Sequence, residues 1–217
     1  MEMNPVLSEV ADAVLELPGG RYRRVAVDGI DGAGKTHFAN ALAKELILRG
    51  APVVRASADG FYNPPKTRHR RSQSSPEGFY RDSFDYGSFI RLLLDPLGPD
   101  GSGSYVSEVY DWQRERHVTR QPQLAAPESI LVVDGIFLLR DELVQFWDYT
   151  IWLDVPFDVA IPRGASPRGY YDADPKSPGN RRYIDGQRLY FAECNPRGRA
   201  SIVIDNTDVA NPAIAVS

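Results

Sequence analysis

The chain is poor in cysteine and in long apolar runs, and each shortage excludes a class of protein. Cys194 is the single cysteine among 217 residues, so an internal disulfide framework is excluded and a reducing compartment is expected. No apolar run reaches the length of a membrane span, and the N-terminus lacks the basic and apolar segments of a signal peptide. We therefore expect a soluble, cytoplasmic protein with no membrane partner.

Lysine is scarce as well, with 4 lysines against 21 arginines. The formal net charge of -4 offers no basic field to duplex nucleic acid, so no nucleic-acid partner is expected. Hydrophobic residues make up 42% of the chain and charged residues 25%, which is ordinary for a globular protein. Arginine is the better bidentate phosphate ligand, but a codon bias also raises its number, so only local clusters of arginine indicate a site.

Apolar segments typical of strands alternate with segments of helical spacing. Helices are expected over residues 5–17, 36–49, 86–97 and 181–194, and strands over 23–29, 52–59, 129–139, 149–155 and 200–208. Two polar, proline-containing segments, 63–78 and 162–180, read as loops. The alternation predicts an α/β fold with three layers, in which helices cover a mainly parallel central sheet and the site lies at the carboxyl ends of the strands.

A glycine-rich segment follows the first expected strand. Residues 29–36, GIDGAGKT, match G-x-x-x-x-G-K-[ST] between a strand and a helix, the context that a phosphate-binding P-loop requires. Backbone N–H groups of such a loop turn toward phosphate oxygens, and the helix adds the positive end of its dipole. Lys35 would reach the β- and γ-phosphates of ATP, and the Thr36 hydroxyl would bind Mg²⁺. The predicted nucleotide-binding residues are Gly29, Ile30, Asp31, Gly32, Ala33, Gly34, Lys35, Thr36 and His37.

Two further expected strands end in an aspartate. Asp134 closes the apolar run ILVVD and is a candidate partner of Mg²⁺, directly or through water, or else a cap for the following turn. Asp59 follows the second strand and could cap a loop, bind a metal or accept a proton from a substrate hydroxyl. We favour the proton acceptor, on the expectation that this strand lies next to the P-loop strand.

Five motifs, taken in order, resemble the uridine kinase and phosphoribulokinase family of P-loop kinases. They are the P-loop, ASADGFY, SFDYGSF, VYDWQRER and VVDGIF, and no GTP-reading N-K-x-D string accompanies them. The resemblance implies transfer of the γ-phosphoryl group of ATP, with Mg²⁺, to a hydroxyl of a small-molecule substrate. It implies Asp59 as catalytic base and contacts of Asp85 and Tyr110 with a nucleoside, uridine or cytidine accepting at the 5′-hydroxyl. Phe61 and Tyr62 are candidates for the wall around the base. Asp85 as a helix N-cap and Tyr110 as a core residue are the structural alternatives.

The resemblance also implies a lid and a turn beside the adenine. Arg163 and Arg168 are the candidate lid arginines, although Pro162 and Pro167 are expected to break a helix there. Arg181 and Gln187 are candidate substrate contacts, or part of a solvated charged face. Asp205 and Asn206 are candidates for the nucleotide site, or for a plain turn.

The basic run at residues 68–71 could bind an acidic substrate or be a solvated loop. Uridine kinases usually have glutamate in place of Asp134 and a histidine where this chain has WQRER. Pantothenate or a sugar therefore stays open as the acceptor, and so does a non-catalytic ATP-binding regulator.

We expect one P-loop kinase domain over residues 1–217, with an N-terminal helix in 1–20, a substrate-side loop at 63–78 and a lid at 162–190. The oligomeric state stays open, a homo-oligomer included.

Overall fold

The computed structural model describes residues 5–165 and 171–215, and its centre is a six-stranded sheet. The strand order is β10-β9-β8-β1-β7-β2, parallel throughout except for the antiparallel β10. The strands are β1 (Arg23–Gly29), β2 (Val53–Ser57), β7 (Ile130–Asp134), β8 (Tyr149–Asp154), β9 (Ile202–Asp205) and β10 (Ala213–Ile214). The expected mainly parallel α/β sheet is confirmed.

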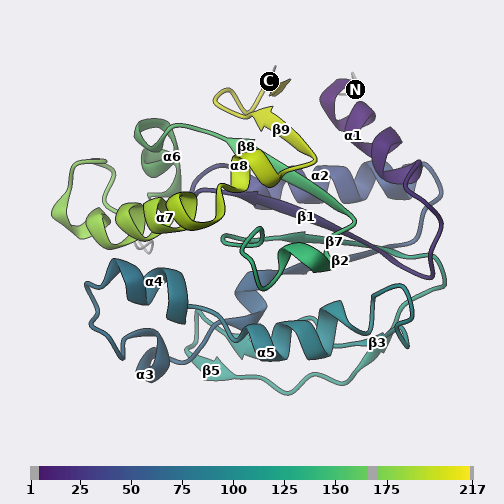
Figure 1. Ribbon diagram of the computed structural model, residues 1–217, viewed down its shortest axis with the longest axis horizontal. Coiled ribbons are helices and arrows are strands. Elements are labelled where there is room, and N and C mark those ends of the chain that lie inside the picture. The colour runs from purple at the N-terminus through teal and green to yellow at the C-terminus, as the bar shows by residue number, and fades with distance from the viewer. Residues whose placement is uncertain (1–4, 166–170, 216–217) are drawn as a thin grey trace.

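Helices lie on both sides of this sheet, as Figure 1 shows. They are α1 (Pro5–Leu15), α2 (Lys35–Leu48), α3 (Pro65–Arg68), α4 (Pro76–Asp82), α5 (Tyr86–Phe89), α6 (Phe157–Gly164), α7 (Arg181–Cys194) and α8 (Pro196–Arg199). A π-helical segment, Ile90–Leu94, continues α5, and 3₁₀ turns span Ala58–Phe61, Val144–Phe146 and Pro178–Asn180. Two short antiparallel pairs, β3 (Ser104–Tyr105) with β6 (Gln123–Leu124) and β4 (Tyr110–Asp111) with β5 (Arg116–His117), complete the described chain.

The core lies against the sheet because its central strands are apolar on both faces. Val25, Ala26 and Val27 of β1 are fully buried, as parallel strands covered on two sides require. α1 lies outside α2, and the Arg49 side chain joins the two by donating to Ser8 and Asp12. Among the described residues, no helix is long and apolar enough to cross a membrane.

The strand order corrects one expectation. β2 pairs with β7 and not with β1, so β7 separates the strand before Asp59 from the P-loop strand. Ser57 and Asp134, the last residues of β2 and β7, lie level with each other and with Val27 of β1. Asp134 therefore lies between the P-loop and the segment of Asp59.

Both expected loops contain helix. The segment 63–78 holds α3 and the start of α4, and the Ser75 hydroxyl caps α4 by accepting from the Gly78 N–H. Pro162 and Arg163 belong to the last turns of α6 rather than to a loop. A proline is tolerated there because Pro162 and Asp158 are exposed, so water can serve the carbonyl that the proline ring leaves without a donor.

Helices α4 and α7 lie side by side, which brings the substrate-side segment against the last long helix (Figure 1). Gly186 of α7 permits this approach, because a Cβ there would lie 2.7 Å from the Pro76 carbonyl oxygen. Phe79 of α4 packs edge-on against Tyr183 of α7, with ring centroids 5.0 Å apart. The two helices thus hold a common wall for the site described next.

Candidate active site

The P-loop connects β1 to α2 and is shaped by backbone conformations that favour glycine. Gly32 has φ +77°, and a Cβ there would lie 1.9 Å from the Ala160 carbonyl oxygen of α6. α2 begins at Lys35 without a side-chain cap, so the N–H groups of its first turn are free to bind a phosphate. The Lys35 ammonium donates to the Ile30 carbonyl at 2.8 Å, which folds the side chain over the loop.

Thr36 and Asp134 meet in front of the P-loop. The Thr36 hydroxyl donates to Asp134 Oδ2 at 2.5 Å, while Arg55 of β2 donates to Asp134 Oδ1 at 2.5 Å. A hydroxyl and a carboxylate side by side are oxygen donors of the kind that Mg²⁺ prefers, so the residues present fit this ion. Within the described parts of the chain, no three His, Cys, Asp or Glu side chains converge on one metal position.

Asp59 lies in the 3₁₀ turn after β2 and faces the same space as Lys35 and Asp134. Burial, together with the negative charges of Asp134 and Asp31, raises the pKa of Asp59 to about 7, and the charge of Lys35 opposes this. A carboxyl group with a pKa near neutrality is suited to accept a proton and release it again.

Two cavities adjoin at the P-loop. One, of about 490 Å³, is lined by Lys35, Thr36, Asp59 and Asp134 together with Arg163 and glycines of the loop. The other, of about 350 Å³, is more apolar and is lined by Leu7, Phe38, Ala41, Val209 and Pro212 among others. Gly34, His37 and Val209 line both. The first cavity suits the phosphates of a nucleotide because it is polar, and the adjoining second cavity suits the base because it is apolar.

The turn after β9 is fastened to the P-loop. The buried Asn206 side chain donates to the Ala33 carbonyl at 2.7 Å, and Arg163 of α6 donates to the Asn206 and Thr207 carbonyls. Asp205 instead points to the surface, where the Thr207 N–H donates to its carboxylate at 2.8 Å. Asn206 and Arg163 therefore lie at the nucleotide cavity, whereas Asp205 stabilises a turn.

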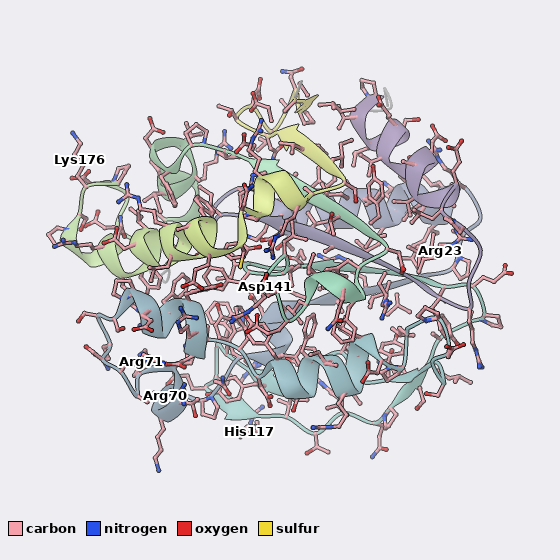
Figure 2. The ribbon with its side chains drawn as sticks, in the orientation of Figure 1. Arg23, Arg70, Arg71, His117, Asp141 and Lys176 are labelled. Carbon is pink, nitrogen blue, oxygen red and sulfur yellow. The ribbon has the colours of Figure 1, made fainter. Side chains whose placement is uncertain are left out.

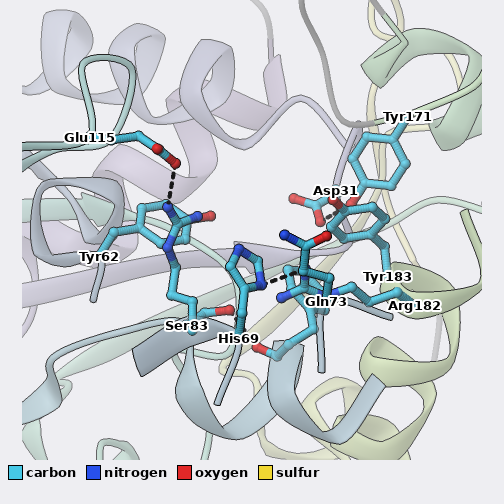
Figure 3. A pocket seen from close by; sticks show the side chains of 11 residues that line it. Asp31, Tyr62, His69, Gln73, Ser83, Glu115, Tyr171, Arg182 and Tyr183 are labelled. Atoms are coloured by element: carbon cyan, nitrogen blue, oxygen red, sulfur yellow. Dashed lines mark hydrogen bonds and ion pairs between the residues drawn. The ribbon is translucent and has the colours of Figure 1, made fainter. Parts of the chain in front are cut away.

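A third cavity, of about 310 Å³, opens on the other side of Asp31 (Figure 3). Tyr62, Tyr171 and Tyr183 supply aromatic walls, and His69 and Arg182 lie at its centre and lower side. Asp31 lines both this cavity and the 490 Å³ cavity at the phosphate end. The Tyr171 hydroxyl donates to the Asp31 carboxylate, and burial together with that charge raises the pKa of Tyr171, so the phenol keeps its proton.

Three predicted substrate residues have structural surroundings instead. Phe61 is fully buried and packs edge-on against Phe89, with ring centroids 5.1 Å apart. Tyr110 is buried with its ring against His117. The Asp85 carboxylate accepts from the Ser88 N–H at 3.0 Å and caps α5. Phe61 thus lies in the core and lines none of the three cavities, and the surroundings of Tyr110 and Asp85 match the alternatives of a core tyrosine and an N-cap.

The predicted residues of the lid region are dispersed. Gln187 is buried, and its amide is used at both ends: Oε1 accepts from the Asp31 N–H at 2.8 Å and Nε2 donates to the Tyr183 carbonyl at 3.0 Å. It positions the P-loop rather than reading a base. Arg181 is 83% exposed on its side chain and pairs with Asp185 at 3.5 Å, outside the three cavities. Arg168 lies outside the described residues.

The basic run divides into two pairs. Arg70 and Arg71, close to α3 and α4 in Figure 2, both pair with the buried Asp82. Arg68 and His69 line the third cavity instead. The sequence does not show that the run divides in this way, because Asp82, the buried partner of Arg70 and Arg71, lies on another helix.

Several residues of the site were not predicted from the sequence. Arg55 lies inside a strand pattern, where an arginine among apolar residues signals a buried partner. Tyr171 lies in no motif, and His69 is predicted only as a member of the basic run at residues 68–71. Asp28, in the buried strand before the P-loop, accepts from Tyr190 at 2.6 Å, and burial raises its pKa to about 6. An acid inside the run VAVDG was the available signal.

Comparison with known proteins gives one family and several related folds. The model of the family described as phosphoribulokinase / uridine kinase matches residues 25–172. A uridine kinase of Pasteurella multocida (strain Pm70) is 26% identical over 145 residues, which cover 64% of this chain and 64% of that protein. The match thus spans somewhat less than two thirds of that relative's length.

Two solved structures share the fold. A possible uridine kinase from Bacillus stearothermophilus superposes with a TM-score of 0.74 at 22% identity, over 94% of this chain and 99% of the other. A D-glycerate 3-kinase from Cryptococcus neoformans var. grubii superposes with a TM-score of 0.55 at 13% identity, over 87% and 88%. At such identities the likeness concerns the fold alone.

Proposed function

Since this chain belongs to the phosphoribulokinase / uridine kinase family, we propose that it transfers the γ-phosphoryl group of ATP to a hydroxyl of a small molecule. The observation that carries the proposal is the shared cavity of Lys35, Thr36, Asp59 and Asp134. A phosphate cradle, a pair of oxygen donors for Mg²⁺ and a carboxyl group with a pKa near 7 there face one another. A protein that only binds a nucleotide does not require this carboxyl group.

The nucleotide would bind along the two adjoining cavities. Backbone N–H groups of the P-loop and the first turn of α2 bind the β- and γ-phosphates, and the Lys35 ammonium neutralises their charge. The base occupies the apolar end between Leu7 and Val209. Thr36 and Asp134 are the residues that would hold Mg²⁺, and the ion would supply charge neutralisation on the phosphate oxygens.

Asp59 would serve the acceptor. Its carboxylate takes the proton of the acceptor hydroxyl, the oxygen forms a bond to the γ-phosphorus, and the bond from that phosphorus to the β-phosphate oxygen breaks to leave ADP. Arg163 lies on the same cavity and would neutralise charge on the transferred group. The 310 Å³ cavity across Asp31 is the place for the rest of the acceptor.

The sequence pattern favours uridine or cytidine as acceptor, with pantothenate or a sugar as alternatives. The aromatic walls of Tyr62, Tyr171 and Tyr183 support a flat acceptor. The residues predicted to bind a nucleoside do not support a nucleoside acceptor, because Gln187, Tyr110 and Asp85 make contacts within the fold. The cytoplasmic location and the single-domain organisation stay predictions.

The test is release of ADP with a panel of acceptors and Mg²⁺. We expect Lys35→Ala and Asp59→Asn each to lower kcat/KM by about 100-fold or more, because they remove the phosphate cation and the proton acceptor. Lys44→Ala, an exposed lysine on the same helix as Lys35, is the matched control and should keep full activity. Full activity of Asp59→Asn would refute its assignment as base. ATP binding without turnover of any acceptor would favour a nucleotide-binding regulator.

A further inference from the structure

The 310 Å³ cavity, which the proposal above assigns to the acceptor and which is called the acceptor cavity from here on, carries a basic group on the side that faces α3 and α7. It consists of Arg68, His69 and Arg182, which come from the end of α3 and the first turn of α7. Arg182 Nη1 lies 3.3 Å from His69 Nδ1, a contact drawn in Figure 3. The Arg68 guanidinium lies 5.4 Å from the centre of the Tyr62 ring, over one aromatic wall of the cavity. Segments more than 100 residues apart therefore bring three nitrogen-rich side chains to one place.

All three side chains of this basic group present hydrogen-bond donors. An arginine can only donate, so His69 Nδ1 accepts from Arg182 and the ring proton lies on Nε2. Burial and the charges of Arg182 and Arg68 lower the pKa of His69, which keeps the ring in this neutral, donating form. Figure 3 shows the other ring nitrogen directed into the cavity. Groups that donate hydrogen bonds complement a carboxylate or a phosphate, which only accept them.

Two acids line this cavity as well. Glu115 pairs with Arg68 at 3.0 Å, and 58% of its side chain is exposed. Asp31 belongs to the P-loop and accepts from Tyr171, beside which it lies in Figure 3. Arg70 and Arg71 are directed away from the cavity to Asp82. Around His69 the lining thus has two arginines, Arg68 and Arg182, and one acid, Glu115, which leaves a net positive charge among these side chains.

We propose that the acceptor is an alcohol that carries a carboxylate or phosphate, and that His69 and Arg182, supported by Arg68, bind this anionic group. The hydroxyl then lies toward Asp31 and Asp59, at the junction with the nucleotide cavity. This inference rests on the proposed kinase function and names the acceptor class of that same site. A neutral nucleoside would offer these side chains no negative charge to bind.

Matched acceptor pairs test the class. Glycerate, pantothenate and a pentose 5-phosphate are compared with glycerol, pantothenol, the unphosphorylated pentose, uridine and cytidine, by ADP release. We expect turnover with at least one anionic member and a kcat/KM at least about 100-fold below it for its neutral partner. Whether the productive member is a carboxylate or a phosphate identifies the group. A higher kcat/KM for uridine, cytidine or any neutral partner would overturn the proposal.

Variants locate the contact. Arg182→Met should lower kcat/KM for the productive anionic acceptor by about 10- to 100-fold and leave its neutral partner unchanged, while Arg182→Lys should lose less. Arg188→Met, an exposed arginine on the same helix, is the control. Equal losses on charged and neutral acceptors, or a melting temperature lowered in Arg182→Met and restored in Arg182→Lys without a change in selectivity, would indicate a structural arginine and refute the contact.

Failure of the kinase function is recognisable separately. If ATP binds and no acceptor is turned over, calorimetric titration with the three anionic compounds decides the subsite. Binding that Arg182→Met weakens and Arg188→Met does not would support the anion subsite in a regulator. No binding of any anionic compound to the unaltered chain would refute it.

Discussion

Asp59 combines partial burial with two acidic neighbours, and this sets the pH at which it can work. Its pKa is raised to about 7, first by burial and then by Asp134 and Asp31. Only the deprotonated carboxylate accepts a proton, so kcat/KM for the acceptor should rise as the pH increases through the pKa of Asp59. The measurement uses saturating Mg²⁺-ATP and an acceptor that does not titrate in this range. A flat profile would contradict the role of Asp59.

At the residue scale, the sequence predicted which side chains meet in the cavity at the P-loop better than it predicted which side chains line the cavity across Asp31. Lys35, Thr36 and Asp134 follow from a contiguous motif and a strand end, where local pattern and local geometry coincide. Phe61 is predicted from its place in the motif ASADGFY, and Gln187 from the family resemblance. Their roles depend on burial and on partners in distant elements, Phe89 and the Asp31 N–H, which no local pattern reports.

Helix α1 lies outside the family match and still reaches the nucleotide cavity. The match begins at residue 25, whereas Leu7 of α1 lines the apolar end of the cavity. α1 is held there by the burial of Val10 and Val14 and by the contacts of Arg49. The sequence predicts the helix from its spacing but not its position at the site, since that depends on packing against α2.

Leu7→Ala tests this contribution. Removing the side chain exposes the apolar end of the cavity, and the dissociation constant for ADP should rise about threefold to tenfold, roughly 1 kcal/mol. Calorimetry measures it. Leu48→Ala, at a leucine that is 72% exposed on α2, should bind ADP as the unaltered chain does. Identical affinities for the two variants would exclude α1 from the nucleotide site.

At the element scale, long periodic segments were predicted and short ones were missed. α1, α2 and α7 show helical spacing over three or four turns and occur where expected. α3 and α6 are short and contain proline, so their patterns read as loops. The position of β2 at the sheet edge was also missed, because chain order does not give strand order.

At the scale of the whole molecule, one buried carboxylate connects three distant parts of the chain. Asp28 of β1 accepts from the Tyr190 hydroxyl of α7 at 2.6 Å and from the Leu139 N–H at 3.1 Å. The same hydroxyl accepts from Leu139 at 2.9 Å. One hydroxyl therefore links the central strand, the loop after β7 and the helix that faces the acceptor.

Tyr190→Phe should weaken this tie without creating a cavity. The buried carboxylate and N–H lose a partner, so the free energy of unfolding should fall by about 1–3 kcal/mol. Denaturant titration measures it. Tyr105→Phe removes a hydroxyl that donates to Gln123 at the surface and should change stability by less than about 0.5 kcal/mol. Equal changes in the free energy of unfolding would show that the hydrogen bonds of the Tyr190 hydroxyl stabilise the fold no more than a surface hydrogen bond does.

Asp31 forms a common wall between the nucleotide and acceptor cavities, with its N–H held by Gln187 and its carboxylate by Tyr171. A single synthetic molecule can therefore occupy both cavities if its linker passes this one side chain. Joining an adenosine polyphosphate to an acidic acceptor analogue would make binding of the second half intramolecular, with a gain of roughly 10²–10⁴ over either half. The side chain that lines both cavities would thus define the linker of a bisubstrate inhibitor of the proposed kinase.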